Sequence, residues 1–150
     1  GELSKTLDYV LDEVQKESSL EKEIAEEEQK AEDKEAKILY HADVGKRREE
    51  RGIEIMVYDV DFGDDGTYVN LKVENRTEDE ISFYISLCYA IQNRRQFRSN
   101  NSHNINRSIS SGVVEEGWIL FEALDHSKSN VMFYFKFSRQ ITIGIEVETV

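Results

Sequence analysis

The sequence contains no proline and a single cysteine, Cys88. One cysteine excludes an internal disulfide, so the protein is not a disulfide-stapled scaffold. Cys88 lies among apolar residues in the pattern of a strand, which favours a structural thiol over a reactive one. Without proline, the exposed edges of any sheet must be protected by charged side chains instead.

The chain also lacks a surplus of positive charge. Among its 150 residues, 31 are Asp or Glu and 19 are Lys or Arg, so the formal net charge is −12. Recognition of phosphates needs a basic footprint, and this balance argues against nucleic acid as a partner. No apolar run approaches the roughly 20 residues of a membrane-spanning helix.

Signatures of catalysis and of cofactor binding are missing as well. The sequence has no Gly-x-Ser-x-Gly element and no cysteine with a placed histidine partner. The three histidines, His41, His103 and His126, lie far apart without the spacing of metal ligands. We therefore expect a protein that is not an enzyme and that needs no cofactor.

Apolar and polar residues alternate from Ile53 to Val150, which predicts β-strands with one apolar face each. An apolar sheet face must be buried, and a second sheet is the simplest partner. The fold class expected for residues 53–150 is therefore all-β, an antiparallel β-sandwich. The predicted strands are Ile53–Phe62, Thr67–Asn75, Glu80–Gln92, Val113–Leu124, Val131–Phe137 and Ile141–Val147.

Two irregularities stand out within this region. The apolar residues of Ile53–Phe62 change phase along the segment, which predicts a β-bulge or a switch between sheets. Residues 93–111 are polar and are expected to form a long loop, with room for a short strand near Phe97 or Ile105–Ile109. A seventh strand there would complete the count of an immunoglobulin-like sandwich.

The N-terminal third has a different character. Residues 1–40 combine high helix propensity with a short apolar stripe, so we expect an α-helical segment. It is either a solvated stalk or a homo-oligomerisation helix. Residues 41–52 carry mixed charges and are expected to form a linker. The stripe consists of Leu3, Leu7, Val10 and Val14.

Four arginines fall in the long polar segment: Arg94, Arg95, Arg98 and Arg107, with Phe97 among them. In an acidic protein they form a local positive region. The planar guanidinium group pairs with carboxylates and phosphates in bidentate fashion. Long loops often carry binding residues. We therefore expect this segment to contact a carboxylate, a phosphate or an acidic glycan.

Four aspartates, Asp59, Asp61, Asp64 and Asp65, surround the first predicted turn. Carboxylate oxygens are the ligands that Ca²⁺ prefers. The segment does not have the spacing of an EF-hand loop. Two interpretations remain open, a calcium site at the end of the sandwich and a solvated hairpin turn.

Two blocks give the chain a family resemblance. Tyr68–Asn75 is a strand that ends in asparagine and is followed by the charged turn Arg76–Glu80, and Gly117–Glu122 is a Gly–hydrophobic–Phe strand. Together they resemble a bacterial immunoglobulin-like domain of unknown function, found in secreted proteins and lipoproteins of Gram-positive bacteria. This family often has Pro-Gly before the second block, where this chain has Glu115 and Glu116.

The resemblance implies export and binding, and it provides no catalytic residues. We therefore expect a non-enzymatic extracellular or cell-envelope module that binds a protein or an envelope component. Tethering through a removed N-terminal lipid anchor would fit this setting. The alternatives are an intracellular structural or regulatory protein oligomerised through its N-terminal helix, and a calcium-dependent binding module.

Overall fold

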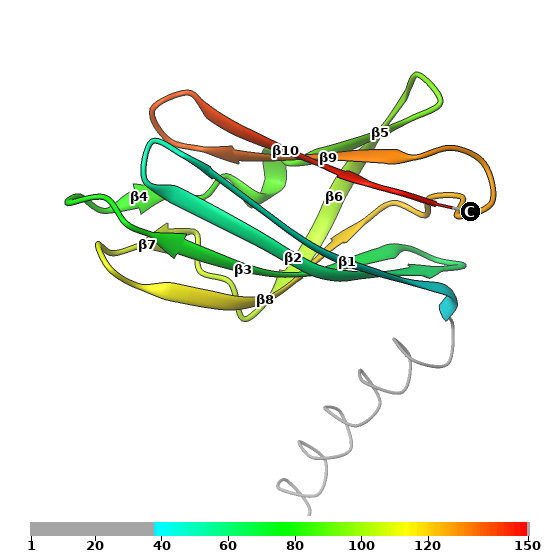
Figure 1. Cartoon of the computed structure of the whole chain (residues 1–150), viewed down its shortest axis with the longest axis horizontal. Helices are drawn as coiled ribbons and strands as arrows, with labels where there is room; N and C mark the ends of the chain where they lie inside the picture. The colour runs from blue at the N-terminus through cyan, green and yellow to red at the C-terminus, as the bar shows by residue number, and fades with distance from the viewer. Residues whose placement is uncertain (1–37, 150) are drawn as a thin grey trace, which may run out of the picture. The chain divides into compact units, whose positions relative to one another are not determined.

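The computed structural model describes residues 38–149, which form an all-β antiparallel arrangement (Figure 1). The compact unit begins at Ile38 and not at Ile53. Most of the expected helical segment, including Leu3, Leu7, Val10 and Val14, lies outside the described residues. Within residues 38–149, no helix is long and apolar enough to cross a membrane.

Ten strands and one short 3₁₀ helix make up this part of the chain. The elements are β1 (Ile38–Glu50), β2 (Ile53–Gly63), β3 (Thr67–Asn75), β4 (Ile81–Ser82), η1 (Ile85–Leu87), β5 (Tyr89–Gln92), β6 (Arg95–His103), β7 (Ser108–Ile109), β8 (Val114–Phe121), β9 (Val131–Phe137) and β10 (Ile141–Val147).

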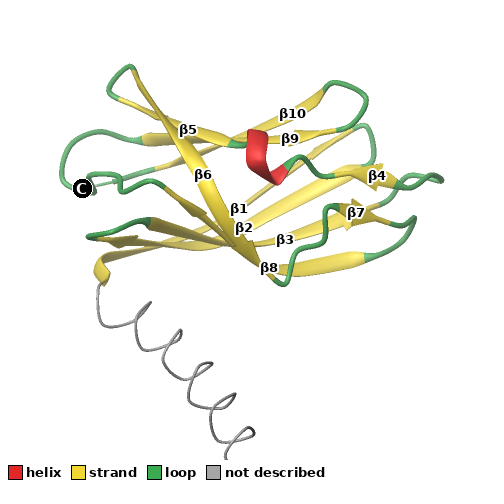
Figure 2. Cartoon of the chain, turned by 180° about the vertical axis from the view of Figure 1, so that it is seen from behind, coloured by secondary structure: helices red, strands yellow, loops and turns green. Residues whose placement is uncertain are grey.

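Eight of the strands form one antiparallel sheet in the order β1-β2-β3-β8-β6-β5-β9-β10, and β4 pairs with β7 separately. The sheet folds over into two layers because β6 runs from one to the other (Figure 2). The first half of β6 pairs with β5, and its second half pairs with β8. One layer therefore contains β1, β2, β3 and β8, and the other contains β5, β9 and β10.

The two edge strands of this sheet, β1 and β10, come close enough for the sheet to be nearly closed. Lys46 Nζ in β1 donates to the carbonyl oxygen of Glu146 at 2.7 Å, and Arg48 Nη1 donates to that of Gly144 at 2.7 Å. These cations satisfy acceptors on an edge that contains no proline. Charged side chains therefore protect this edge, as the composition predicts.

The apolar faces of the two layers form the core. Phe121 of β8 packs edge-on against Phe133 of β9, with ring centroids 5.0 Å apart, and both rings are fully buried. Along β9 and β10 the buried residues alternate without interruption. The boundaries observed for β3, β9 and β10 are those that the alternation predicts.

The prediction of a linker over residues 41–52 is wrong, because these residues belong to β1 and to the turn that follows it. The turn is made by Arg51 and Gly52, which both have positive φ angles of 50° and 86°. Two such residues in succession suit a tight hairpin. β1 is an edge strand that buries few side chains, so it has little of the apolar alternation on which the prediction depended.

The segment Glu80–Gln92 is not one continuous strand, although its apolar alternation is the clearest in the chain. It contains β4, then η1, then β5. The interruption occurs where the chain leaves the layer of β3 and enters the layer of β5. The amide of Cys88 donates to the carbonyl of Ile85, which closes the 3₁₀ turn at this crossing.

The expected long loop over residues 93–111 contains β6, a strand of nine residues, and the short β7. The turn into β6 is made by Asn93 and Arg94, with φ angles of 56° and 66°. β6 is mostly exposed, because it crosses between the layers rather than lying within one. The sequence of β6 is polar for this reason, and the periodicity of apolar residues alone does not reveal the strand.

The predicted bulge in β2 is confirmed. The register between β2 and β3 shifts between Val57 and Asp59, so Tyr58 is the extra residue. Before the bulge Val57 faces the core, and after it Val60 does. The bulge therefore turns Asp59 and Asp61 to the outer face of the layer.

Candidate functional site

The structure separates the arginines of the predicted binding segment. Arg94 lies in the β5–β6 turn, and Arg95 begins β6 with its guanidinium carbon 5.0 Å from the centre of the Phe97 ring. Arg107 follows the other end of β6, which at about 3.3 Å per residue is roughly 30 Å away. The arginines therefore do not form one continuous surface.

A depression of about 280 Å³ lies beside the start of β6. It is lined by Gln92, Asn93, Arg95, Phe97, Ala123, Asp125 and Lys128. Phe97 is half-buried and packs against the core, so its role is partly structural. The Gln92 amide is buried and donates to the carbonyls of Asp125 and Ser129, which ties this rim together.

Arg98 lies on a different surface, the outer face of the layer formed by β5, β9 and β10. Its register partner in β5 is Tyr89, and Tyr89 is paired with Tyr134 of β9. The two tyrosine rings stack with centroids 4.9 Å apart, and Lys136 Nζ lies 5.8 Å from the centre of the Tyr89 ring. We call Arg98, Tyr89, Tyr134 and Lys136 the cation–tyrosine face.

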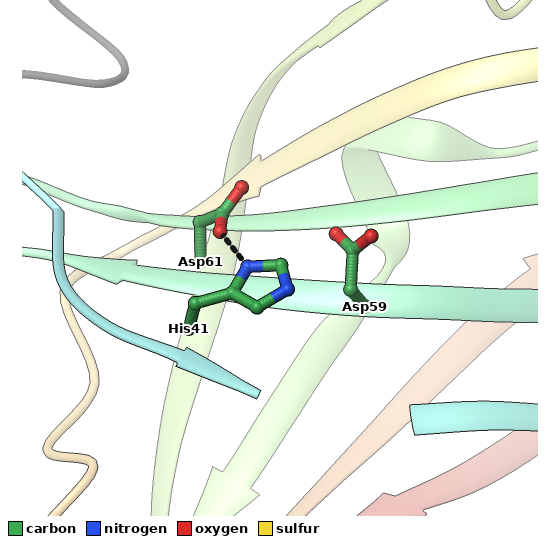
Figure 3. A group of neighbouring side chains, drawn as sticks. All are labelled: His41, Asp59 and Asp61. Atoms are coloured by element: carbon green, nitrogen blue, oxygen red, sulfur yellow. Dashed lines mark hydrogen bonds and ion pairs between the residues drawn. The ribbon is translucent and has the colours of Figure 1, made fainter. Parts of the chain in front are cut away.

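A second cluster lies on the opposite outer face, at the bulge of β2. His41 of β1 is the register partner of Asp61, and Asp43 is that of Asp59 (Figure 3). The ring nitrogen Nδ1 of His41 lies 2.5 Å from Asp61 Oδ1, and Nε2 lies 3.0 Å from Asp43 Oδ1. The potential ligand atoms of His41, Asp59 and Asp61 all lie within 4.8 Å of one another. We call these three residues the histidine–aspartate cluster.

Asn70 of β3 holds the two carboxylates of this cluster. Its amide nitrogen donates to Asp59 Oδ1 and, at 3.2 Å, to Asp61 Oδ2. These bonds use one oxygen of each carboxylate. The other oxygen of the Asp61 carboxylate, Oδ1, is the one that lies 2.5 Å from His41 Nδ1. The amide fixes the orientation of both carboxylates.

The electrostatics of the cluster favour cations. The hydrogen bond that the His41 ring donates to Asp61 raises the pKa of His41, burial lowers it, and the hydrogen bond that the ring donates to Asp43 raises it further, so that the net pKa lies above the ordinary value. The His41 side chain is 48% exposed, whereas that of Asp61 is 9% exposed. The cluster is thus open to solvent at the imidazole and closed at the deeper carboxylate.

The four aspartates considered for calcium do not converge in the described part of the chain. Asp59 and Asp61 come together with His41, whereas Asp64 and Asp65 are exposed in the β2–β3 turn and lie outside the group. Sequence reasoning missed His41 because it is separated from Asp61 by 20 residues. Only the pairing of β1 with β2 brings the two together.

Comparison with protein-family models gives no match, and comparison with curated proteins gives none either. Among solved structures, the chain is similar to the crystal structure of a functionally unknown protein from Listeria monocytogenes EGD-e. The TM-score is 0.57 at 6% sequence identity, over 74% of this chain and 85% of that one. This similarity shows a shared all-β fold and carries no function.

Proposed function

We propose that this chain is a non-enzymatic binding module of immunoglobulin-like type that acts outside the cell or in the cell envelope. The order of strand pairing supports the immunoglobulin-like assignment. In one layer β2, β3, β8 and the second half of β6 follow the order A-B-E-D, and in the other the first half of β6, β5, β9 and β10 follow C′-C-F-G. β1 has no counterpart in this immunoglobulin strand order.

The cation–tyrosine face is the proposed contact surface, and an acidic glycan is the proposed ligand. One observation carries this choice: in a chain of net charge −12, two cations border a stacked pair of tyrosines on an outer sheet face. A tyrosine pair provides a flat apolar surface with hydroxyl groups at its rim. Arg98 offers a planar fork to a carboxylate, and Lys136 a second positive charge.

Binding to polygalacturonate, with uncharged dextran as the reference polymer, tests this proposal. We expect the wild type to be retained on immobilised polygalacturonate and not on dextran. The double variant Arg98→Gln/Lys136→Gln should lose retention. The matched control is Arg107→Gln, which removes an exposed positive charge beyond the far end of β6. Equal retention of all three proteins, or retention of none, would refute the proposed surface and ligand.

The proposed setting is tested separately, by fractionating the native host and detecting the protein with an antibody. We expect it in the culture medium or in the envelope fraction. Recovery in the cytoplasmic fraction would contradict the extracellular setting and would favour the intracellular alternative.

A further inference from the structure

We propose that His41, Asp59 and Asp61 form a binding site for a divalent transition-metal ion of the Zn²⁺ type. This site lies on the outer face opposite the cation–tyrosine face, so it does not depend on the proposed glycan binding.

The backbone is irregular at the place where these side chains converge. The register between β2 and β3 shifts between Val57 and Asp59, and that between β1 and β2 shifts between Asp43 and Lys46. Both irregularities lie at the same level of adjacent strand pairs, where they interrupt the ladder of backbone hydrogen bonds. Bulges are frequent next to functional sites, because they change the direction of a side chain. Here they turn Asp59 and Asp61 outward beside His41.

The spacing of the potential ligand atoms suits an ion after small side-chain rotations. Zinc binds nitrogen and oxygen ligands at about 2.0–2.2 Å, so tetrahedral ligand atoms lie roughly 3.4 Å from one another. The corresponding atoms here lie within 4.8 Å of one another. All three residues belong to the paired strands β1 and β2, whose backbone need not move. Figure 3 shows the imidazole ring of His41 between the two carboxylates.

Asn70 orients both carboxylates of the cluster, which an ion pair between His41 and Asp61 alone would not require. Its amide donates to Asp59 Oδ1 and Asp61 Oδ2, and the other oxygen of Asp61, Oδ1, faces His41 Nδ1. In metal sites, ligating carboxylates are held in this way by outer hydrogen-bond donors. Asn70 is therefore proposed as the positioning residue of the site.

The donor set determines the class of ion. Calcium and magnesium prefer oxygen ligands alone, whereas imidazole nitrogen suits Zn²⁺ and its neighbours in the first transition row. One imidazole and two carboxylates give three protein ligands and leave coordination positions open. Because the His41 side chain is 48% exposed, these positions face solvent, and a further ligand can reach the ion.

Calorimetric titration of the full chain, without a histidine tag and after treatment with chelator, tests the proposal with Zn²⁺ as the probe. We expect one Zn²⁺ site whose affinity falls at least tenfold in His41→Ala and in Asp61→Asn. Asn70→Ala should lose about 10- to 100-fold, the range for outer-shell residues. Asp64→Asn and His103→Ala are the matched controls, and both should bind like the wild type.

Two further measurements do not depend on the heat of binding. Zinc should raise the melting midpoint of the wild type and not that of His41→Ala, because an ion that binds only the folded state stabilises it. Bound Co²⁺ should show the visible absorption of mixed nitrogen and oxygen ligation, and His41→Ala should lose it. Absence of Zn²⁺ binding at millimolar concentration would overturn the proposal, as would wild-type affinity in His41→Ala or lost binding in either control.

Discussion

Cys88 is 1% exposed, at the start of the second layer, and burial raises the pKa of its thiol to about 12 from an ordinary value of 9.0. Only the thiolate is nucleophilic, so the native protein should react very slowly with a thiol reagent at pH 8. We expect slow labelling or none in native buffer. Labelling should be rapid in 6 M guanidinium, a standard denaturing condition. Rapid labelling of the native protein would contradict the burial of this residue.

The same pKa difference links Cys88 to alkaline stability. The unfolded chain loses its thiol proton above pH 9, whereas the folded chain keeps it until about pH 12. The free energy of unfolding should therefore fall as the pH rises through this window, and the contribution of Cys88 is fully present below pH 9. Urea unfolding of the wild type and of Cys88→Ala between pH 8 and 11 separates this contribution from those of other groups.

The buried side-chain amide of Asn75 holds the turn that follows β3 in place. It is 0% exposed, and its amide nitrogen donates to the carbonyls of Asp79 at 2.8 Å and Ile109 at 2.9 Å. Its side-chain oxygen accepts from the amide and the hydroxyl of Thr77. The asparagine that ends the Tyr68–Asn75 block therefore fixes the turn after β3 and attaches it to β7.

At the scale of elements, β6 depends on a close approach that only glycine allows. A Cβ atom at Gly117 in β8 would overlap the carbonyl oxygen of His103 in β6. Gly117→Ala must therefore push the second half of β6 away from β8, at a cost of several kcal/mol, as overpacking against backbone does. Urea unfolding should show this loss.

Gly45→Ala is the matched control for that experiment. Gly45 has a φ of +59° and nothing within 4 Å of the position of an added Cβ, so alanine there brings only backbone strain. We expect a loss of about 1–2 kcal/mol, the cost of placing a Cβ atom in the left-handed region. Equal losses at the two glycines would show that the crossing of β6 tolerates a side chain.

At the scale of the whole molecule, stability depends on contact between the two layers. Phe133→Ala removes a fully buried ring that packs against Phe121 of the other layer. Such truncations cost about 3–5 kcal/mol, which is much of the total stability of a small domain. Phe97→Ala, at a half-buried position, should cost clearly less in the same chemical denaturation. A small effect of Phe133→Ala would mean that the layers hold together by other contacts.

The amino-acid sequence by itself determined the class of the fold and several of its elements. The alternation of Thr67–Asn75, Val131–Phe137 and Ile141–Val147 placed three strands at their observed boundaries, and the phase change in Ile53–Phe62 placed the bulge. This succeeded because each of these strands buries one face, and burial of one face imposes a period of two on the sequence.

Only the tertiary structure decided the rest. β1 and β6 bury few side chains, so their sequences carry no such period, and they become strands by pairing with neighbours that are already in place. The same pairing separated the arginines of residues 94–107 from one end of β6 to beyond the other, and joined His41 to Asp61 across 20 residues. A candidate site made of side chains from separate strands depends on register, and register is fixed by the packing of the whole sheet.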